Sequence, residues 1–260
     1  MAADWSLPRP GRGALAVWRR NLRVWRKLLA PAVVLNFGEP TLYLLGLGFG
    51  LGAFIDTMSG MPYLVFLASG IIASSAMTTA SFEATYSVFT RMQVQRTYEA
   101  MLATPLTLDD ILAGELLWCA TKATFSAAAI LAVATLLGVV GGWQALWVLP
   151  LAFLIGLCFA GPALVMSAVS DNYDFFNYYF VLGVTPMLIL SGVFYPIEGL
   201  PESAQAAIGV LPLAHAIALT RPLVAGLPVN DVLLHVAVLV AYAAGGFHVA
   251  LALTRRRLLV

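Results

Sequence analysis

Charged side chains are scarce in this sequence. They make up 10% of the 260 residues, whereas about 25% is usual for soluble domains. Hydrophobic residues reach 61%, the net charge is only +1, and the mean hydropathy is +0.89. This composition excludes a soluble globular enzyme, a disordered chain and a nucleic-acid-binding domain, because each of those needs more polar surface. It leaves an integral membrane protein.

The sequence also lacks the residue patterns of common catalytic and cofactor sites. The two cysteines, Cys119 and Cys158, stand inside apolar runs, so we interpret them as buried thiols. The three histidines are not spaced as metal ligands, and there is no phosphate-binding loop of the form Gly-x-x-x-x-Gly-Lys-Ser/Thr. We therefore expect no catalytic residues, metal or cofactor in this chain, and any energy source must come from a partner or from an ion gradient.

Long apolar runs predict an all-α integral membrane protein with six transmembrane helices, because one span needs about 20 apolar residues. Of the 14 Lys and Arg residues, seven precede the first span, two lie between the second and third, and three end the chain. The remaining two are Lys122, inside the third span, and Arg221, on the opposite side. This bias places both termini in the cytoplasm. The expected spans are residues 28–55, 61–82, 116–140, 147–169, 175–194 and 232–254.

Two segments on the cytoplasmic side have helical patterns of their own. In residues 1–27, Leu15, Trp18, Leu22 and Trp25 share one face and cationic residues cover the rest. This predicts an amphipathic helix in the headgroup layer, either as an anchor alone or also touching a cytoplasmic partner. The loop 83–115 contains Pro105 and a capping pattern from Thr107 to Asp110, which predicts helix, break, helix.

The outer loop, residues 195–231, is interrupted by prolines but apolar between them. Stretches 204–211 and 214–220 are too short to span, so we expect re-entrant or surface helices there, between spans five and six. Glu39 is the one clearly deep acid, about 11 residues into the first span, with Pro40 after it. It either lines a pathway or pairs inside the bundle, with Lys122 as one candidate, although Lys122 could instead snorkel to the surface.

Six stretches carry a resemblance to a known family. The chain resembles the ABC-2 family of transporter permeases, and within it the permeases that export lipo-oligosaccharides from rhizobia. The resemblance implies that residues 28–260 form a permease domain in a bacterial cytoplasmic membrane. It also implies a homodimer that works with two copies of a cytoplasmic ABC ATPase, which binds ATP and Mg. The stretches are residues 39–52, 91–101, 106–111, 185–192, 211–215 and 255–259.

The same resemblance assigns roles to particular residues. Its coupling helix, which contacts the ATPase, corresponds to an exposed surface of Arg91, Gln95, Arg96, Tyr98, Glu99 and Met101. We expect a pathway between spans one, two and five, with candidates Glu39, Pro40, Tyr43, Phe176 and Tyr179. The outer gate candidates are Phe194, Tyr195, Leu211 and His215.

The predicted function is export of an amphiphile with an acyl chain and a sugar head, without nucleic acid as a partner. One alternative is efflux of a drug or hydrophobic metabolite. An alternative of another class is a membrane-embedded transferase acting on lipid-linked sugars, for which Asp171 and Asp174 are the nearest acidic cluster. A purely structural scaffold is a third.

Overall fold

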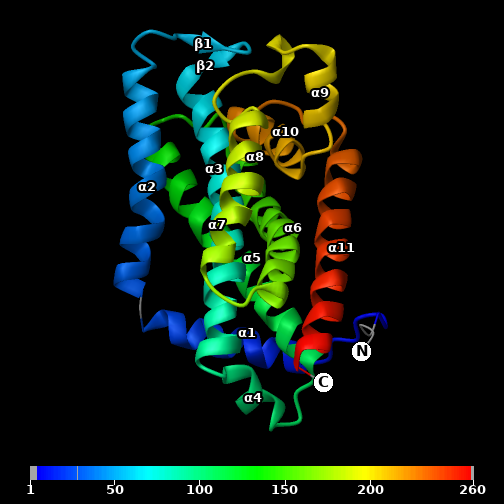
Figure 1. Ribbon diagram of the computed structural model, residues 1–260. Coiled ribbons are helices and arrows are strands. Elements are labelled where there is room, and N and C mark those ends of the chain that lie inside the picture. Colours follow the sequence, from blue (N-terminus) through cyan, green and yellow to red (C-terminus); the bar gives the residue numbers. More distant parts are fainter. Residues whose placement is uncertain (1–4, 28, 259–260) are drawn as a thin grey trace.

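The computed structural model describes residues 5–27 and 29–258, without the side chains of 29–37, 39 and 40. Helices run side by side along most of its length (Figure 1). Helix α1 (Gly13–Arg26) lies across one end, close to both ends of the chain, and helix α2 (Leu29–Gly50) rises along one side. A small antiparallel hairpin of β1 (Thr57–Met58) and β2 (Met61–Pro62) lies at the other end.

The remaining helices fill the bundle and its two ends. They are α3 (Tyr63–Phe82), α4 (Thr97–Leu102), α5 (Leu108–Leu136), α6 (Val148–Val169), α7 (Asp174–Tyr179), α8 (Thr185–Leu190), α9 (Glu202–Ile208), α10 (Pro212–Ala225) and α11 (Val232–Leu258). Three π-helical stretches extend them at Glu83–Ser87, Thr90–Val94 and Phe180–Val184, and 3₁₀ turns stand at Trp143–Trp147 and Ile197–Gly199.

Four helices of the described chain are long and apolar enough to cross a membrane: Tyr63–Val94, Leu108–Leu136, Trp143–Val169 and Val232–Leu258. Helices α9 and α10, bent by 91° against each other, would together make a fifth. The first and fifth expected spans are represented by shorter apolar helices, Thr41–Gly50 within α2 and Asp174–Leu190. The structure therefore describes a multi-pass membrane protein, and the count of six spans stays a prediction.

The second and third spans are longer than expected. Helix α3 continues through two π-helical stretches to Val94, and α5 begins at Leu108 instead of residue 116. The predicted capping box is confirmed, because Thr107 Oγ1 accepts the Asp110 N–H at 3.2 Å and Asp110 Oδ2 accepts the Thr107 N–H at 3.2 Å. The irregular part of the loop 83–115 thus shrinks to the segment around α4.

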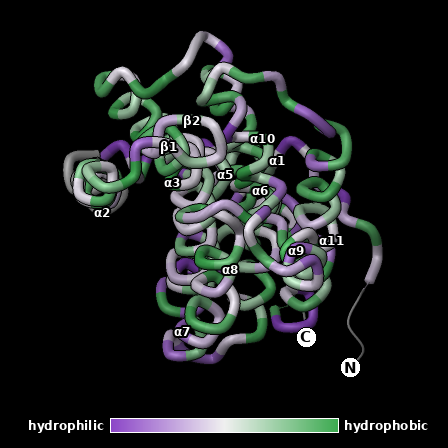
Figure 2. The backbone as a smooth tube through the Cα atoms, turned by 90° about the horizontal axis from the view of Figure 1, so that it is seen from above, coloured by the Kyte–Doolittle hydropathy of each residue, from purple (hydrophilic) through white to green (hydrophobic). Residues whose placement is uncertain are grey.

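Small residues set the distance between the central helices. A Cβ added at Gly156 of α6 would lie 2.6 Å from Ala120 Cα of α5, and one at Gly246 of α11 would lie 2.6 Å from Pro162 Cδ of α6. Helices in lipid gain stability from such close approach, since lipid offers no hydrophobic driving force between them. On the outside of the bundle, large apolar side chains such as Leu42, Leu182 and Leu233 are exposed. Figure 2 shows that α2, α8 and α11 consist largely of hydrophobic residues, drawn in green.

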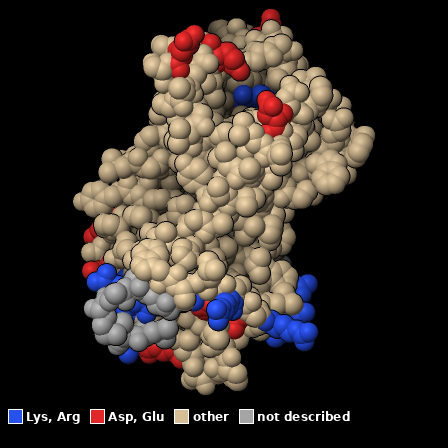
Figure 3. All heavy atoms as spheres, turned by 90° about the vertical axis from the view of Figure 1, so that its right-hand side faces the viewer, with Lys and Arg blue, Asp and Glu red and all other residues tan. Residues whose placement is uncertain are grey.

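The two ends of the bundle differ in charge. Lys and Arg gather at the end that carries α1, α4 and the C-terminus, which we call the basic end, whereas acidic side chains prevail at the other, which we call the outer end (Figure 3). The C-terminal arginines are partly structural: Arg255 donates three hydrogen bonds to Asp109, at 2.7, 2.8 and 3.2 Å, and Arg257 donates to the carbonyl of Ala168. These bonds fasten the end of α11 to the start of α5 and the end of α6.

The helix packing makes a testable prediction. Replacing Gly156 with Ile should destabilise the protein by about 1–3 kcal/mol, because the new side chain overpacks the α5–α6 contact. Gly245→Ile is the matched control, since a Cβ at Gly245 of α11 meets nothing within 4 Å. Thermal unfolding of both variants in the same detergent measures the difference. Equal losses of stability would contradict the packing assignment.

Candidate functional site

Four buried charges meet at the basic end. Arg91 Nη2 lies 3.0 Å from Glu83 Oε1 and 2.7 Å from Glu115 Oε2, and Lys122 Nζ lies 2.8 Å from Glu83 Oε2. The side chains are 13%, 5%, 0% and 19% exposed for Arg91, Glu83, Glu115 and Lys122. Two acids balance two bases, so this buried charge cluster is neutral, as burial of charge requires.

The depth of the cluster follows from the length of α3. That helix has 20 residues, which at about 1.5 Å per residue cover about 30 Å, the thickness of the hydrocarbon core. Glu83 is the next residue, so the cluster lies at the edge of the hydrocarbon on the basic end. Little water is available at that depth, so the charged groups must form hydrogen bonds and ion pairs with one another.

Neutral side chains complete the hydrogen bonding and bring in α1. Asn21 of α1 donates to Glu115 Oε2 at 2.9 Å, and Trp118 of α5 donates to Glu83 Oε1 at 3.0 Å. Gly114 of α5 allows α1 to pass close to α5, since a Cβ at Gly114 would lie 2.6 Å from the carbonyl oxygen of Ala14 in α1. The cluster therefore joins α1, the lower end of the second span and the start of α5.

The most buried residues of α1 are not those of the apolar face that the sequence predicts for the headgroup layer. Ala14, Val17 and Asn21 are buried, whereas Leu15 is 45% exposed. The two Trp residues still face α5: Trp18 Nε1 donates to Thr121 Oγ1 at 2.9 Å, and Trp25 stacks on Phe125 with ring centroids 4.9 Å apart. The face is rotated because Asn21 is drawn inward by Glu115, a contact that a hydrophobic pattern does not register.

The coupling candidates separate into an exposed and a buried group. The predicted continuous helix from Arg91 to Met101 is broken at Arg96, which has the left-handed φ of 49°. Arg96 and Glu99 are 75% and 64% exposed, and Gln95 is exposed with them. These three residues form what we call the α4 surface, below the bundle in Figure 1.

Arg91 and Tyr98 were predicted to lie on the exposed docking face, and the structure shows that they do not. Arg91 belongs to the buried charge cluster, and Tyr98 is fully buried, so burial raises the pKa of its hydroxyl above the ordinary value of 10.0. Met101 is half-buried and packs against the core. Tyr98 and Met101 hold α4 to the bundle, and Gln95, Arg96 and Glu99 stay exposed as the α4 surface.

The pathway candidates are not brought together. Phe176 is fully buried among rings, with centroids 5.1 Å from Tyr86 and 5.3 Å from Phe89, so it does not line an open channel in this conformation. Tyr179 is half-buried, and Tyr43 is 49% exposed on α2. Glu39 and Pro40 belong to α2, but their side chains lie outside the described residues. Lys122 is bound to Glu83, which replaces the snorkelling expected of it.

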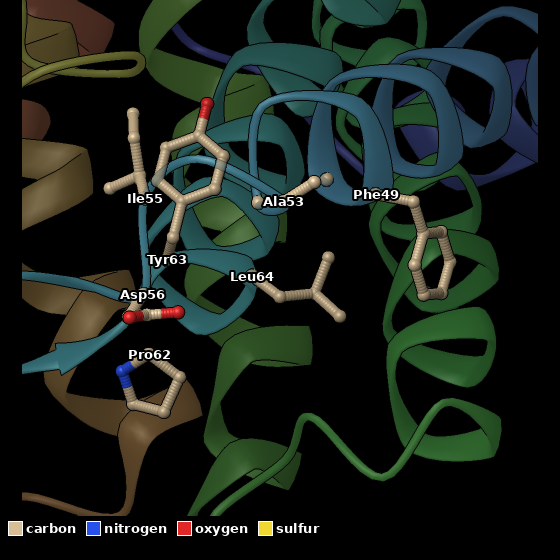
Figure 4. A pocket seen from close by; sticks show the side chains of 9 residues that line it. Phe49, Ala53, Ile55, Asp56, Pro62, Tyr63 and Leu64 are labelled. Atoms are coloured by element: carbon tan, nitrogen blue, oxygen red, sulfur yellow. The ribbon is translucent and has the colours of Figure 1, made fainter.

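A pocket of about 430 Å³ opens between α2 and α3 at the outer end (Figure 4). Its lining is apolar apart from Asp56 and Tyr63, and none of the described pathway candidates contributes to it. The pocket thus stands apart from the residues chosen from the sequence.

The outer gate candidates surround α10, and the prediction of two short helices in this loop is confirmed by α9 and α10. His215 of α10 is 8% exposed, whereas Leu211, just before α10, and the separate pair Phe194 and Tyr195 are half-buried. Arg221, the single cation expected on this side, lies 3.6 Å above the Phe66 ring. It also donates to the Gly192 carbonyl at 2.6 Å, so α10 is bound into the bundle at α3 and at the end of α8.

Sequence reasoning missed Glu83, Glu115, Asn21 and Trp118. A signal was present, because Glu83, Ser87 and Arg91 recur at intervals of four residues and Glu115, Trp118 and Lys122 at three and four. Each set therefore shares one helical face. The acids of the transferase alternative do not form a site: Asp171 pairs with Arg257 at 3.0 Å, and the described residues hold no group of three or more metal-type ligands.

The chain is similar in sequence to known proteins over most of its length. A family model described as "ABC-2 type transporter" matches residues 14–224. Nodulation protein J of Rhizobium leguminosarum bv. viciae is 46% identical over 98% of both chains, and that of Rhizobium meliloti (strain 1021) is 42% identical over 98% of this chain and 97% of its own. The inner membrane transport permease YadH of Escherichia coli (strain K12) is 28% identical over 76% of this chain and 75% of its own. No solved structure gave a significant match.

The buried charge cluster can be tested by a double-mutant cycle. Glu83→Gln and Lys122→Met should each destabilise the protein by about 3–5 kcal/mol, because each leaves an uncompensated buried charge. The double variant should cost less than the sum of the two, because the cluster is neutral again.

The exposed pair Arg96 and Glu99, 3.9 Å apart, is the control for that cycle. Its coupling energy should stay below about 0.5 kcal/mol, as for other surface pairs. Reversible unfolding in detergent gives all the values. Additive effects of Glu83→Gln and Lys122→Met would show that the two side chains do not form a pair.

Proposed function

The chain belongs to the ABC-2 type transporter family and is a transport permease, and on this premise we propose that it exports an amphiphile with an acyl chain and a sugar head. Two copies would work with two ATPase subunits that supply ATP hydrolysis with Mg. The basic end would face the cytoplasm, in keeping with the excess of Lys and Arg there. The similarity to nodulation proteins supports the substrate class.

The observation that carries this proposal is the buried charge cluster, whose Arg91 lies only four residues before the α4 surface begins at Gln95. An ATPase that pushes on Arg96 and Glu99 moves α4, which Tyr98 anchors to the bundle. The motion reaches α1, the second span and α5 together, because the cluster holds all three. Separating paired charges at low dielectric costs several kcal/mol, so these elements move as a rigid body and do not deform.

The partner copy is proposed to lie against α2. Leu42 and Phe49 are 71% and 58% exposed, and Gly46 and Gly50 lie near the same face, where an added Cβ would meet no described residue within 4 Å. Small residues flanked by large apolar ones favour a close helix–helix contact in lipid. The pathway between the copies would then run beside α2, α3 and the helices from α7 to α8, with α10 closing its outer end.

Co-purification from the native membrane in mild detergent tests the transporter assignment. We expect a P-loop ATPase in equal amount to this chain, and mass spectrometry of the bound lipids should find an acylated sugar. A preparation that keeps its dimer but contains no ATPase would contradict the proposal. A transported drug or apolar metabolite without sugar would keep the family assignment and overturn the substrate class.

The α4 surface makes its own prediction. Arg96→Glu should lower transport at least about tenfold, the effect of losing 1.4 kcal/mol of docking energy, while the thermal stability of the permease stays unchanged. Arg256→Glu is the matched control, because Arg256 is another exposed cation at the basic end, on the last turn of α11. ATP-driven efflux from proteoliposomes is the measurement. Full activity of Arg96→Glu with normal ATPase binding would contradict this role for the surface.

A further inference from the structure

Two histidines that the coupling and pathway arguments do not use face each other at the outer end. His215 Nδ1 of α10 lies 2.7 Å from His235 Nδ1 of α11. The other nitrogen of the first ring, His215 Nε2, lies 2.8 Å from the carbonyl oxygen of Gly209, which follows α9. His215 is 8% exposed and His235 is half-buried. One imidazole pair thus connects α9, α10 and α11.

The partners of the rings determine where their protons are. A carbonyl oxygen only accepts, so His215 Nε2 must carry a proton and donate to Gly209. In a neutral His215 the Nδ1 atom is then an acceptor, and the proton between the rings belongs to His235 Nδ1. A proton added at His235 Nε2 leaves this bond intact. A further proton can only go to His215 Nδ1, where it would place two N–H groups and two positive charges against each other.

Few other charges face this pair. Just before α11 the charged neighbour is Asp231, whose backbone carbonyl accepts the backbone N–H of His235 at 3.1 Å. On α10 the cation Arg221 is turned toward α3, where its Nε donates to Ser69 Oγ at 3.3 Å. Glu202 stands at the opposite end of α9 from Gly209. Tyr242 of α11 donates to the carbonyl of Val210 at 3.0 Å, which is a neutral contact.

The histidine pair is one of two polar attachments that hold α10 in place. Arg221 fastens α10 to α3 and to the end of α8, whereas the histidine pair fastens it to α11. We propose that His215 and His235 form a pH-dependent contact between α10 and α11 at the outer end, which we call the clasp. The contact persists while the pair carries at most one added proton, and a second added proton breaks it. The clasp would regulate the outer gate, and in that respect it rests on the proposed function.

A distance measurement tests the clasp without ATPase or substrate. Nitroxide labels on Ala218→Cys of α10 and Leu233→Cys of α11, both exposed positions, report the α10–α11 separation by pulsed electron paramagnetic resonance in nanodiscs. The native Cys119 and Cys158 are buried and do not compete for label. Labelled chains are diluted with unlabelled ones so that each dimer carries one labelled copy.

We expect a short distance at about pH 7.5 and a longer one at about pH 4.5, on either side of the ordinary imidazole range near 6.5. Below the midpoint the short-distance fraction should fall about tenfold per pH unit, as for a one-proton step. His235→Asn should keep the short distance at both pH values, because its uncharged amide donates to a neutral His215 Nδ1 through its N–H and, turned over, accepts from a protonated Nδ1 through its oxygen. His235→Phe removes the donor and should give the longer distance throughout.

His248→Asn is the matched control, because His248 lies on α11 away from His215 and beside Trp5, with ring centroids 5.9 Å apart and ring planes tilted by 47°. It should behave as the wild type does. A wild-type distance that does not change with pH would overturn the proposal, and so would a pH response that survives in His235→Asn. Because the measurement needs no ATPase, a failed co-purification would leave its result standing.

Discussion

The pairing of Glu83 and Glu115 with Arg91 and Lys122 is the contact on which the basic end depends. Helix α3 must continue as π-helix beyond the hydrocarbon for Glu83 and Arg91 to reach the same site, and α5 must begin at Leu108 for Glu115 to be inside a helix. Since each partner would otherwise be a bare charge at the membrane edge, the helices extend to meet one another. The crossing of α1 follows, because Asn21 takes a remaining acceptor position on Glu115.

The outer end is held differently. There α10 is bound by contacts of Arg221 and His215 to carbonyl, hydroxyl and imidazole groups and to the Phe66 ring, and by its packing against α3. Carbonyl and imidazole partners can be exchanged for water at lower cost than buried ion pairs. This contrast suits a permease in which the basic end transmits a push as a unit and the outer end opens.

Local features of the fold were accessible to sequence reasoning because their causes are local. The capping box at Thr107 needs only Asp110 three residues later, and Pro201 and Pro212 stand at the starts of α9 and α10, although Pro222 lies inside α10. The boundaries of the second and third spans were wrong for a related reason. The sequence pattern places Glu83 and Glu115 in a loop, because isolated charges end apolar runs. In the structure each acid pairs with a base on another helix: Glu115 with Arg91, 24 residues away in the chain, and Glu83 with Lys122, 39 residues away.

By itself, the sequence determined that this chain is a membrane protein, which end carries the cations, and that a capped helix begins after Pro105. Each of these depends on composition or on neighbours within one turn. Only the tertiary structure decided that Arg91 and Tyr98 are internal, that Asn21 turns the face of α1 inward, and that His215 meets His235. Such pairings join residues from separate helices, and no period within one helix specifies which partner its polar side chains will find.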